Sequence, residues 1–112
     1  MSYYGAEKVV DHYNIMGPVK SALEGTVRYL AAELGPKKIR VNAISPGPLQ
    51  TRAGSGIDHF DELIDAARKR APEQSLISID YVGQMAVGLV SDLSHQVTGN
   101  IAFVDGGYHV LG

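Results

Sequence analysis

Only two short segments of this 112-residue chain are patterned as β-strands, and a long helix-rich stretch separates them. Residues 39–44 alternate with period two before a Ser-Pro-Gly-Pro loop, and residues 101–104 form an apolar run ended by Asp105-Gly106-Gly107. Strands joined through helices lie parallel, and a parallel pair is normally buried within a larger sheet. The pattern therefore predicts an α/β fold. Two strands are too few to complete its sheet.

Apolar side chains recur every three or four residues in three segments, which predicts three helices. The first covers about residues 14–34, with Gly35 as its left-handed cap and Pro36 preventing its continuation. The second covers residues 58–70, with acidic residues at its start and basic residues at its end, as the helix dipole favours. Ser78 is the expected cap of the third. Its predicted buried stripe consists of Val82, Met85, Ala86, Leu89, Val90 and Leu93.

Composition excludes several classes of partner. The net charge of −2 provides no basic field for nucleic acid or an anionic membrane. The absence of cysteine excludes disulfides and thiolate ligands, and the four histidines show no metal-ligand spacing. No apolar run approaches about 18 residues, and the first residues do not resemble a signal peptide. We expect a cytoplasmic protein with no metal, nucleic-acid or membrane partner.

Tyr13 and Lys20 form the pair with the clearest chemical potential. They lie seven residues apart, and seven helical steps return to within about 20° of the starting direction, so both are expected on one face of the first helix. A phenol can donate a hydrogen bond to an oxygen that gains negative charge. A nearby ammonium can bind hydroxyl groups and lower the pKa of the phenol. The pair suits a reduction next to a carbonyl group, although such spacing is also common among surface residues.

Four stretches together carry a family resemblance. They are Ser-Tyr-Tyr-Gly-Ala-Glu (2–7), Tyr-Asn-Ile-Met-Gly-Pro-Val-Lys (13–20), Arg-Val-Asn-Ala-Ile-Ser-Pro-Gly-Pro (40–48) and Val-Asp-Gly-Gly (104–107). The chain resembles the short-chain dehydrogenase/reductase superfamily, and within it the bacterial enoyl-acyl-carrier-protein reductases. The likeness implies the carboxyl-terminal half of a Rossmann-like, doubly wound parallel sheet. Residues 1–112 would then be a single partial domain, without the nucleotide-binding first half.

A second tyrosine–lysine pair, Tyr4 and Lys8, matches the Tyr-x-x-x-Lys signature of carbonyl-reducing members of the superfamily. In the superfamily the active-site lysine precedes the Val-Asn-Ala strand by about two dozen residues. Lys20 lies 22 residues before Asn42, whereas Lys8 lies 34 before it. The spacing favours Lys20, and with it Tyr13 at the Tyr-x6-Lys spacing of the enoyl reductases.

The resemblance implies transfer of a hydride from NADH to the β-carbon of an enoyl thioester, carried by acyl carrier protein or coenzyme A. Tyr13 would donate a hydrogen bond to the thioester oxygen, Lys20 would hold the nicotinamide ribose, and Tyr3 would be a second active-site tyrosine beside the acyl chain. The other implied site residues are Leu49, Thr51 and Ala53 for the cofactor, and Met16, Ile57 and Phe60 for the acyl chain. The family also implies self-association to a dimer or tetramer.

Two alternatives stay open. No Gly-x-Gly-x-x-Gly turn occurs in these residues, which is compatible with a non-enzymatic remnant or an oligomerising module of the family. A carbonyl-reducing short-chain dehydrogenase/reductase would fit if Lys8 were the active-site lysine.

Overall fold

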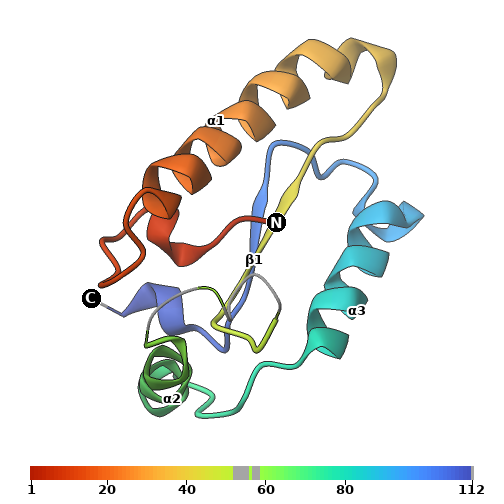
Figure 1. Cartoon of the computed structure of the whole chain (residues 1–112). Helices are drawn as coiled ribbons and strands as arrows, with labels where there is room; N and C mark the ends of the chain where they lie inside the picture. Colours follow the sequence, from red (N-terminus) through yellow and green to blue (C-terminus); the bar gives the residue numbers. More distant parts are fainter. Residues whose placement is uncertain (52–55, 57–58, 112) are drawn as a thin grey trace.

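The computed structural model describes residues 1–51, 56 and 59–111 of the chain. Strands β1 (Ala43–Pro46) and β2 (Ile101–Val104) pair in parallel, with Ala43 opposite Ile101. The helices are α1 (Met16–Leu34), α2 (Phe60–Arg70) and α3 (Ile79–Val90). Figure 1 shows α1 and α3 flanking the strand pair from opposite sides, with α2 near the carboxyl ends of the strands. The predicted parallel α/β arrangement is therefore confirmed.

The core lies between the strands and α3. Ile44, Leu49 and Val82 form its buried centre. The partly buried side chains packed around them are Ile77, Met85, Ala86, Leu89 and Val104. Along α1, on the other side, the buried residues are Glu24, Val27 and Ala31. The amino-terminal segment also joins the strand pair, because the backbone N–H of Ser2 donates to the carbonyl of Ile44 at 2.7 Å.

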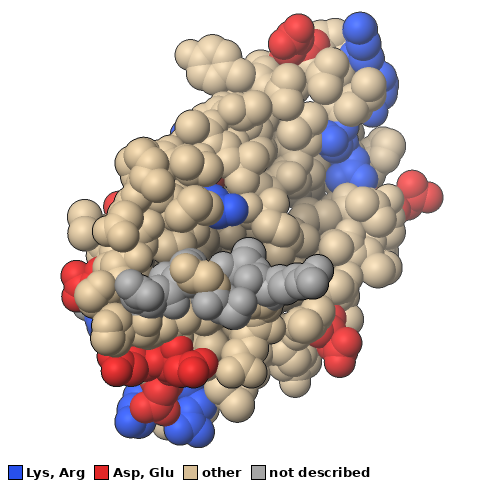
Figure 2. All heavy atoms as spheres, in the orientation of Figure 1, with Lys and Arg blue, Asp and Glu red and all other residues tan. Residues whose placement is uncertain are grey.

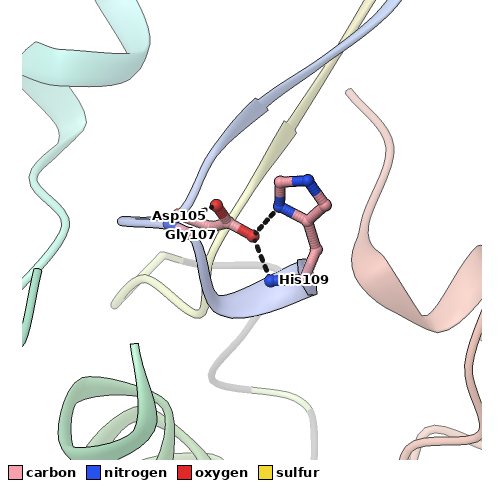
Figure 3. Close-up of polar contacts among 3 residues, drawn as sticks. All are labelled: Asp105, Gly107 and His109. Atoms are coloured by element: carbon pink, nitrogen blue, oxygen red, sulfur yellow. Dashed lines mark hydrogen bonds and ion pairs between the residues drawn. The ribbon is translucent and has the colours of Figure 1, made fainter. Parts of the chain in front are cut away.

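The chain turns sharply after β2 at Asp105-Gly106-Gly107, as predicted for a structural turn. Both glycines have left-handed backbones, with φ of 62° and 86°. The buried carboxylate of Asp105 accepts hydrogen bonds from the backbone N–H of Gly107 at 3.0 Å and of His109 at 2.9 Å. Figure 3 shows that the same carboxylate also meets the His109 ring, whose Nδ1 lies 2.8 Å away. These contacts tie the short 3-10 helix at Tyr108–Val110 to the end of β2.

The carboxyl end of α1 differs from the prediction. Gly35 is right-handed, with φ −53° and ψ −43°, and the chain continues into a 3-10 turn over Gly35–Lys37. Pro36 fits that first turn because its missing N–H needs no partner there. The left-handed residue is Lys38, with φ 62°. The assignment of Gly35 as a left-handed cap was therefore wrong.

The first strand also lies further along the chain than predicted. β1 spans Ala43–Pro46 rather than residues 39–44, because bonds that involve side chains tie the preceding residues to a distant loop. The N–H of Val41 donates to Thr98 Oγ1 at 3.0 Å, and Asn42 Nδ2 donates to the carbonyl of Val97 at 2.8 Å. The guanidinium of Arg40 reaches the same loop. Together with one backbone bond, from the N–H of Gly99 to the carbonyl of Val41 at 2.7 Å, these bonds take the place of a regular strand ladder before Ala43.

The buried stripe of α3 is shorter than predicted. The side chain of Ser78 caps the helix by accepting from the N–H of Tyr81 at 3.3 Å, as expected. Val82 is buried, but Val90 and Leu93 are 80% and 94% exposed. The helix ends at Val90, and Leu93 lies in a separate 3-10 turn over Asp92–Ser94. In the parts of the chain that the structure describes, no helix is long and apolar enough to cross a membrane.

Candidate active site

A mostly apolar cavity of about 440 Å³ opens between the amino-terminal segment, the start of α1, the loop after β1 and the start of α2. Every predicted site residue that the structure describes lines it: Tyr3, Tyr13, Met16, Lys20, Leu49, Thr51 and Phe60. Ala53 and Ile57, also predicted to belong to the site, lie outside the described residues. The fold thus brings together residues that are almost sixty positions apart in the sequence.

Tyr3 and Tyr13 form an aromatic pair in the wall of this cavity. Their ring centroids are 4.9 Å apart, and the rings meet edge to face at 61°. The two residues are only 8% and 6% exposed. Burial raises the pKa of the Tyr13 phenol, and burial with the neighbouring tyrosines raises that of Tyr3 further. Burial is the cause of the Tyr13 shift, so the expected lowering of its pKa by lysine was wrong, and both phenols remain protonated hydrogen-bond donors at neutral pH.

The hydroxyl group of Tyr3 is buried, and none of the described residues forms a hydrogen bond with it. Leaving a buried hydroxyl without a partner costs about 1–3 kcal/mol. The Tyr3 side chain lines the cavity, although its oxygen atom is itself covered by surrounding atoms. The site thus has one buried hydroxyl group without a hydrogen-bond partner among the described residues.

Lys20 contributes the positive charge of the cavity wall. Its Nζ donates a hydrogen bond to the carbonyl of Met1 at 2.9 Å. An ammonium carries three donors, and this bond uses one of them. The remaining donors suit hydroxyl or anionic groups of a ligand.

Tyr13 does not belong to the helix that carries Lys20, which corrects the predicted shared helical face. The helix begins at Met16, and Asn14 has a left-handed backbone with φ 53° between it and Tyr13. Asparagine tolerates that conformation better than most residues. The tyrosine reaches the cavity from a turn, and the lysine reaches it from the helix that follows. The prediction that both lie on one helical face was therefore wrong.

Gly5 packs behind a residue of the site and was missed by the sequence analysis, although it does not itself line the cavity. A Cβ at this position would lie 2.5 Å from Cδ2 and 2.7 Å from Cε2 of Tyr13. Both distances are well below van der Waals contact, so the Tyr13 ring occupies space that only glycine leaves free. This glycine lies inside the Tyr-x-x-x-Lys signature. No local pattern in the sequence indicates that it contacts the ring of Tyr13, eight residues later.

The competing pair, Tyr4 and Lys8, lies elsewhere. The Tyr4 ring packs edge to face on Tyr108, with centroids 5.2 Å apart. Lys8 lines a second open groove along the loop before α1, and Tyr13 is a wall residue of this groove as well as of the cavity. Since neither residue lines the cavity, the geometry favours Tyr13 and Lys20 over the carbonyl-reductase signature.

We expect the raised pKa of Tyr3 to weaken the fold in alkaline solution. Above pH 10, the ordinary tyrosine value, the unfolded chain releases the phenol proton while the folded chain retains it. The free energy of unfolding then falls with pH, by up to about 1.4 kcal/mol per pH unit for one group. Urea unfolding between pH 8 and about 11 measures this slope.

Tyr3→Phe should flatten that slope without destabilising the chain at neutral pH, because it removes a buried hydroxyl that has no partner. Tyr29→Phe is the matched control, since Tyr29 is 82% exposed. Equal slopes in the parent chain and in Tyr3→Phe would show that Tyr3 is not buried as described.

The chain also matches a known protein family over nearly its whole length. Residues 1–109 match the family model described as enoyl-(acyl carrier protein) reductase. The chain is 53% identical over its whole length to an NADH enoyl-acyl-carrier-protein reductase of Rhizobium meliloti, and covers 41% of that protein. It is 49% identical to the corresponding reductase of Aquifex aeolicus, covering 42% of it. The chain therefore spans about two-fifths of the length of these relatives.

Solved structures show the same likeness. The crystal structure of the Aquifex aeolicus reductase superposes on 99% of this chain with a TM-score of 0.94 and 50% identity. The reductase of Anaplasma phagocytophilum, solved in complex with NAD, superposes on 99% with a TM-score of 0.91 and 51% identity. The matched part is 43% and 42% of those chains, respectively.

Proposed function

Because this chain belongs to the enoyl-(acyl carrier protein) reductase family, we propose that it provides the tyrosine–lysine part of an active site that reduces enoyl thioesters with NADH. The observation that carries the proposal is the meeting of Tyr3, Tyr13 and Lys20 in one mostly apolar cavity. Since the chain spans about two-fifths of its relatives, we expect turnover only together with the remaining part of such an enzyme. The same proposal places the chain in fatty acid elongation in the cytoplasm.

The residues around the cavity fit a nicotinamide cofactor. NADH, when bound, supplies the hydride for reduction. We propose that Lys20 holds ribose hydroxyls with the donors that Met1 leaves free, and that Leu49 and Thr51 contact the cofactor. Leu49 and Thr51 follow the carboxyl end of β1, the end at which open α/β sheets bind ligands. Ala53 completes the proposed set from outside the described residues.

Tyr13 has the chemistry needed for the thioester oxygen. When the β-carbon is reduced, the electron pair of the double bond moves through the α-carbon to that oxygen, which becomes an enolate. A protonated phenol stabilises this charge by donating a hydrogen bond, and more strongly in a water-poor cavity than in solution. Burial keeps Tyr13 protonated at neutral pH. Tyr13 therefore acts mainly on the transition state.

The apolar wall suits the acyl chain of the substrate. Tyr3, Met16 and Phe60 line the cavity from three different segments, and Ile57 is proposed to join them. A thioester of acyl carrier protein or of coenzyme A presents the same reacting group, so the wall described here does not choose between them. The hydroxyl of Tyr3 is buried and has no partner among the described residues.

We also propose that the chain self-associates to a dimer or tetramer. Along α1 and the residue before it, Ile15 is 70% exposed and Val19 is 47% exposed, and on α3 Val87 is 66% exposed. Figure 2 shows mostly uncharged side chains along α1 on the face in view. Exposed apolar side chains in such number favour association. Sedimentation at micromolar concentration should give a mass above 12.0 kDa.

The proposal is tested by a chimera in which residues 1–112 replace the matching region of the Rhizobium meliloti relative. We expect the chimera to oxidise NADH in the presence of an enoyl thioester, measured by loss of NADH absorbance. The 112-residue chain alone should bind NADH very weakly in calorimetry and show no turnover.

A chimera that folds and binds NADH but reduces no enoyl thioester would overturn the proposed function. Micromolar NADH binding by the 112-residue chain alone would instead show that it needs no further part for the cofactor.

A further inference from the structure

Two polar side chains one turn apart on α1 hold the amino-terminal segment. Lys20 donates to the carbonyl of Met1 at 2.9 Å. Four residues later, the carboxylate of Glu24 accepts a hydrogen bond from the hydroxyl of Ser2. Residues four apart on a helix point in nearly the same direction, so the two bonds act on consecutive residues of one extended segment.

The Ser2–Glu24 pair is almost completely buried, with 3% and 5% of the two residues exposed. Glu24 stands in the same buried stripe of α1 as Val27 and Ala31. Burying a carboxylate is costly, and an apolar pair of similar size usually stabilises a fold as well or better. Stability alone therefore does not explain a glutamate at this position.

The residue that Glu24 binds stands immediately before Tyr3. Ser2 is held twice, since its N–H donates to the Ile44 carbonyl at 2.7 Å while its hydroxyl donates to Glu24. Tyr3 itself is extended, with φ −158° and ψ 151°. In an extended segment successive side chains point in opposite directions, so fixing the side chain of Ser2 toward α1 directs Tyr3 away from it.

We propose that Glu24, acting through Ser2, is a positioning residue that holds Tyr3 against Tyr13 in the wall of the cavity. Glu24 does not itself line the cavity, so it touches neither the proposed substrate nor the cofactor. The catalytic purpose of this arrangement rests on the proposed function. The arrangement itself can be measured without any activity.

The experiment uses the 112-residue chain with ring-labelled tyrosines followed by NMR. Tyr3→Phe identifies the Tyr3 resonance. In the parent chain we expect ring-to-ring contacts between Tyr3 and Tyr13, and a Tyr3 phenol that stays protonated well above pH 10. Glu24→Gln keeps an acceptor oxygen for Ser2 and should retain both signals.

The double variant Ser2→Ala/Glu24→Leu is the decisive one. It replaces both partners with apolar groups, so it should fold at least as stably as the parent chain. The double variant keeps the backbone bond to Ile44 and the bond from Lys20 to Met1, but it loses the hydrogen bond that fixes the Ser2 side chain. We therefore expect loss of the Tyr3–Tyr13 ring contacts and titration of Tyr3 near its ordinary pKa. In the chimera, the same pair of changes should lower kcat about tenfold, because one site residue, Tyr3, is then partly misplaced.

A folded double variant that keeps the ring contacts and the high pKa of Tyr3 would overturn the positioning role. That result would leave the proposed function standing if the parent chimera is active. Conversely, an inactive parent chimera with a displaced Tyr3 in the double variant would support the positioning role while the proposed function fails.

Discussion

Replacing Tyr13 with phenylalanine in the active chimera should lower kcat by about 10²- to 10³-fold and change KM little. The ring of Tyr13 is packed against Tyr3, so the change removes the hydroxyl and leaves the wall of the cavity in place. The hydroxyl is needed when the thioester oxygen gains charge, and much less when the substrate binds. Steady-state kinetics with an enoyl thioester measures both constants.

Two lysine variants complete the test. Lys20→Ala should weaken NADH binding together with the rate, because the ground state and the transition state both lose the same contact. Lys8→Ala should leave both unchanged, since Lys8 does not line the cavity. If Lys8→Ala abolished turnover of a ketone while Lys20→Ala left it intact, the carbonyl-reductase reading would be correct and the enoyl-reductase assignment wrong.

The second large effect is expected from a single methyl group. Gly5→Ala places a Cβ within 2.5 Å of the Tyr13 ring, so the ring or the short 3-10 helix at Tyr4–Ala6 must move. A shift of about 1 Å at a reacting group can reduce the rate about 10²-fold. We expect Gly5→Ala to lower kcat by that order in the chimera, and to weaken the Tyr3–Tyr13 ring contact in NMR spectra.

Gly25→Ala is the matched control for this prediction. Gly25 lies inside α1, and nothing is within 4 Å of the position its Cβ would take. Alanine there should stabilise the chain by about 0.5–1 kcal/mol, because it favours the helical backbone, and should leave kcat unchanged. Full activity in Gly5→Ala would show that the Tyr13 ring does not need the space that Gly5 leaves.

The family resemblance rested on short motifs and their spacing along the chain. The family model confirms it. The resemblance paired Tyr13 with Lys20, and the structure places both in one cavity that neither Tyr4 nor Lys8 lines. The positions of the helices were also predictable to within a few residues, because helical periodicity depends on neighbours three or four positions away. Such local information is present in any single sequence.

The sequence by itself determined the parallel α/β arrangement, the helix capped at Ser78 and the residue types available for chemistry. Only the tertiary structure decided that β1 begins at Ala43, because the bonds from Val41 and Asn42 end on a loop more than fifty residues away. It also decided that Gly5 makes room for Tyr13 and that Glu24 reaches Ser2. These contacts join segments whose separation is set by packing of the whole chain, and no local periodicity records a contact of that kind.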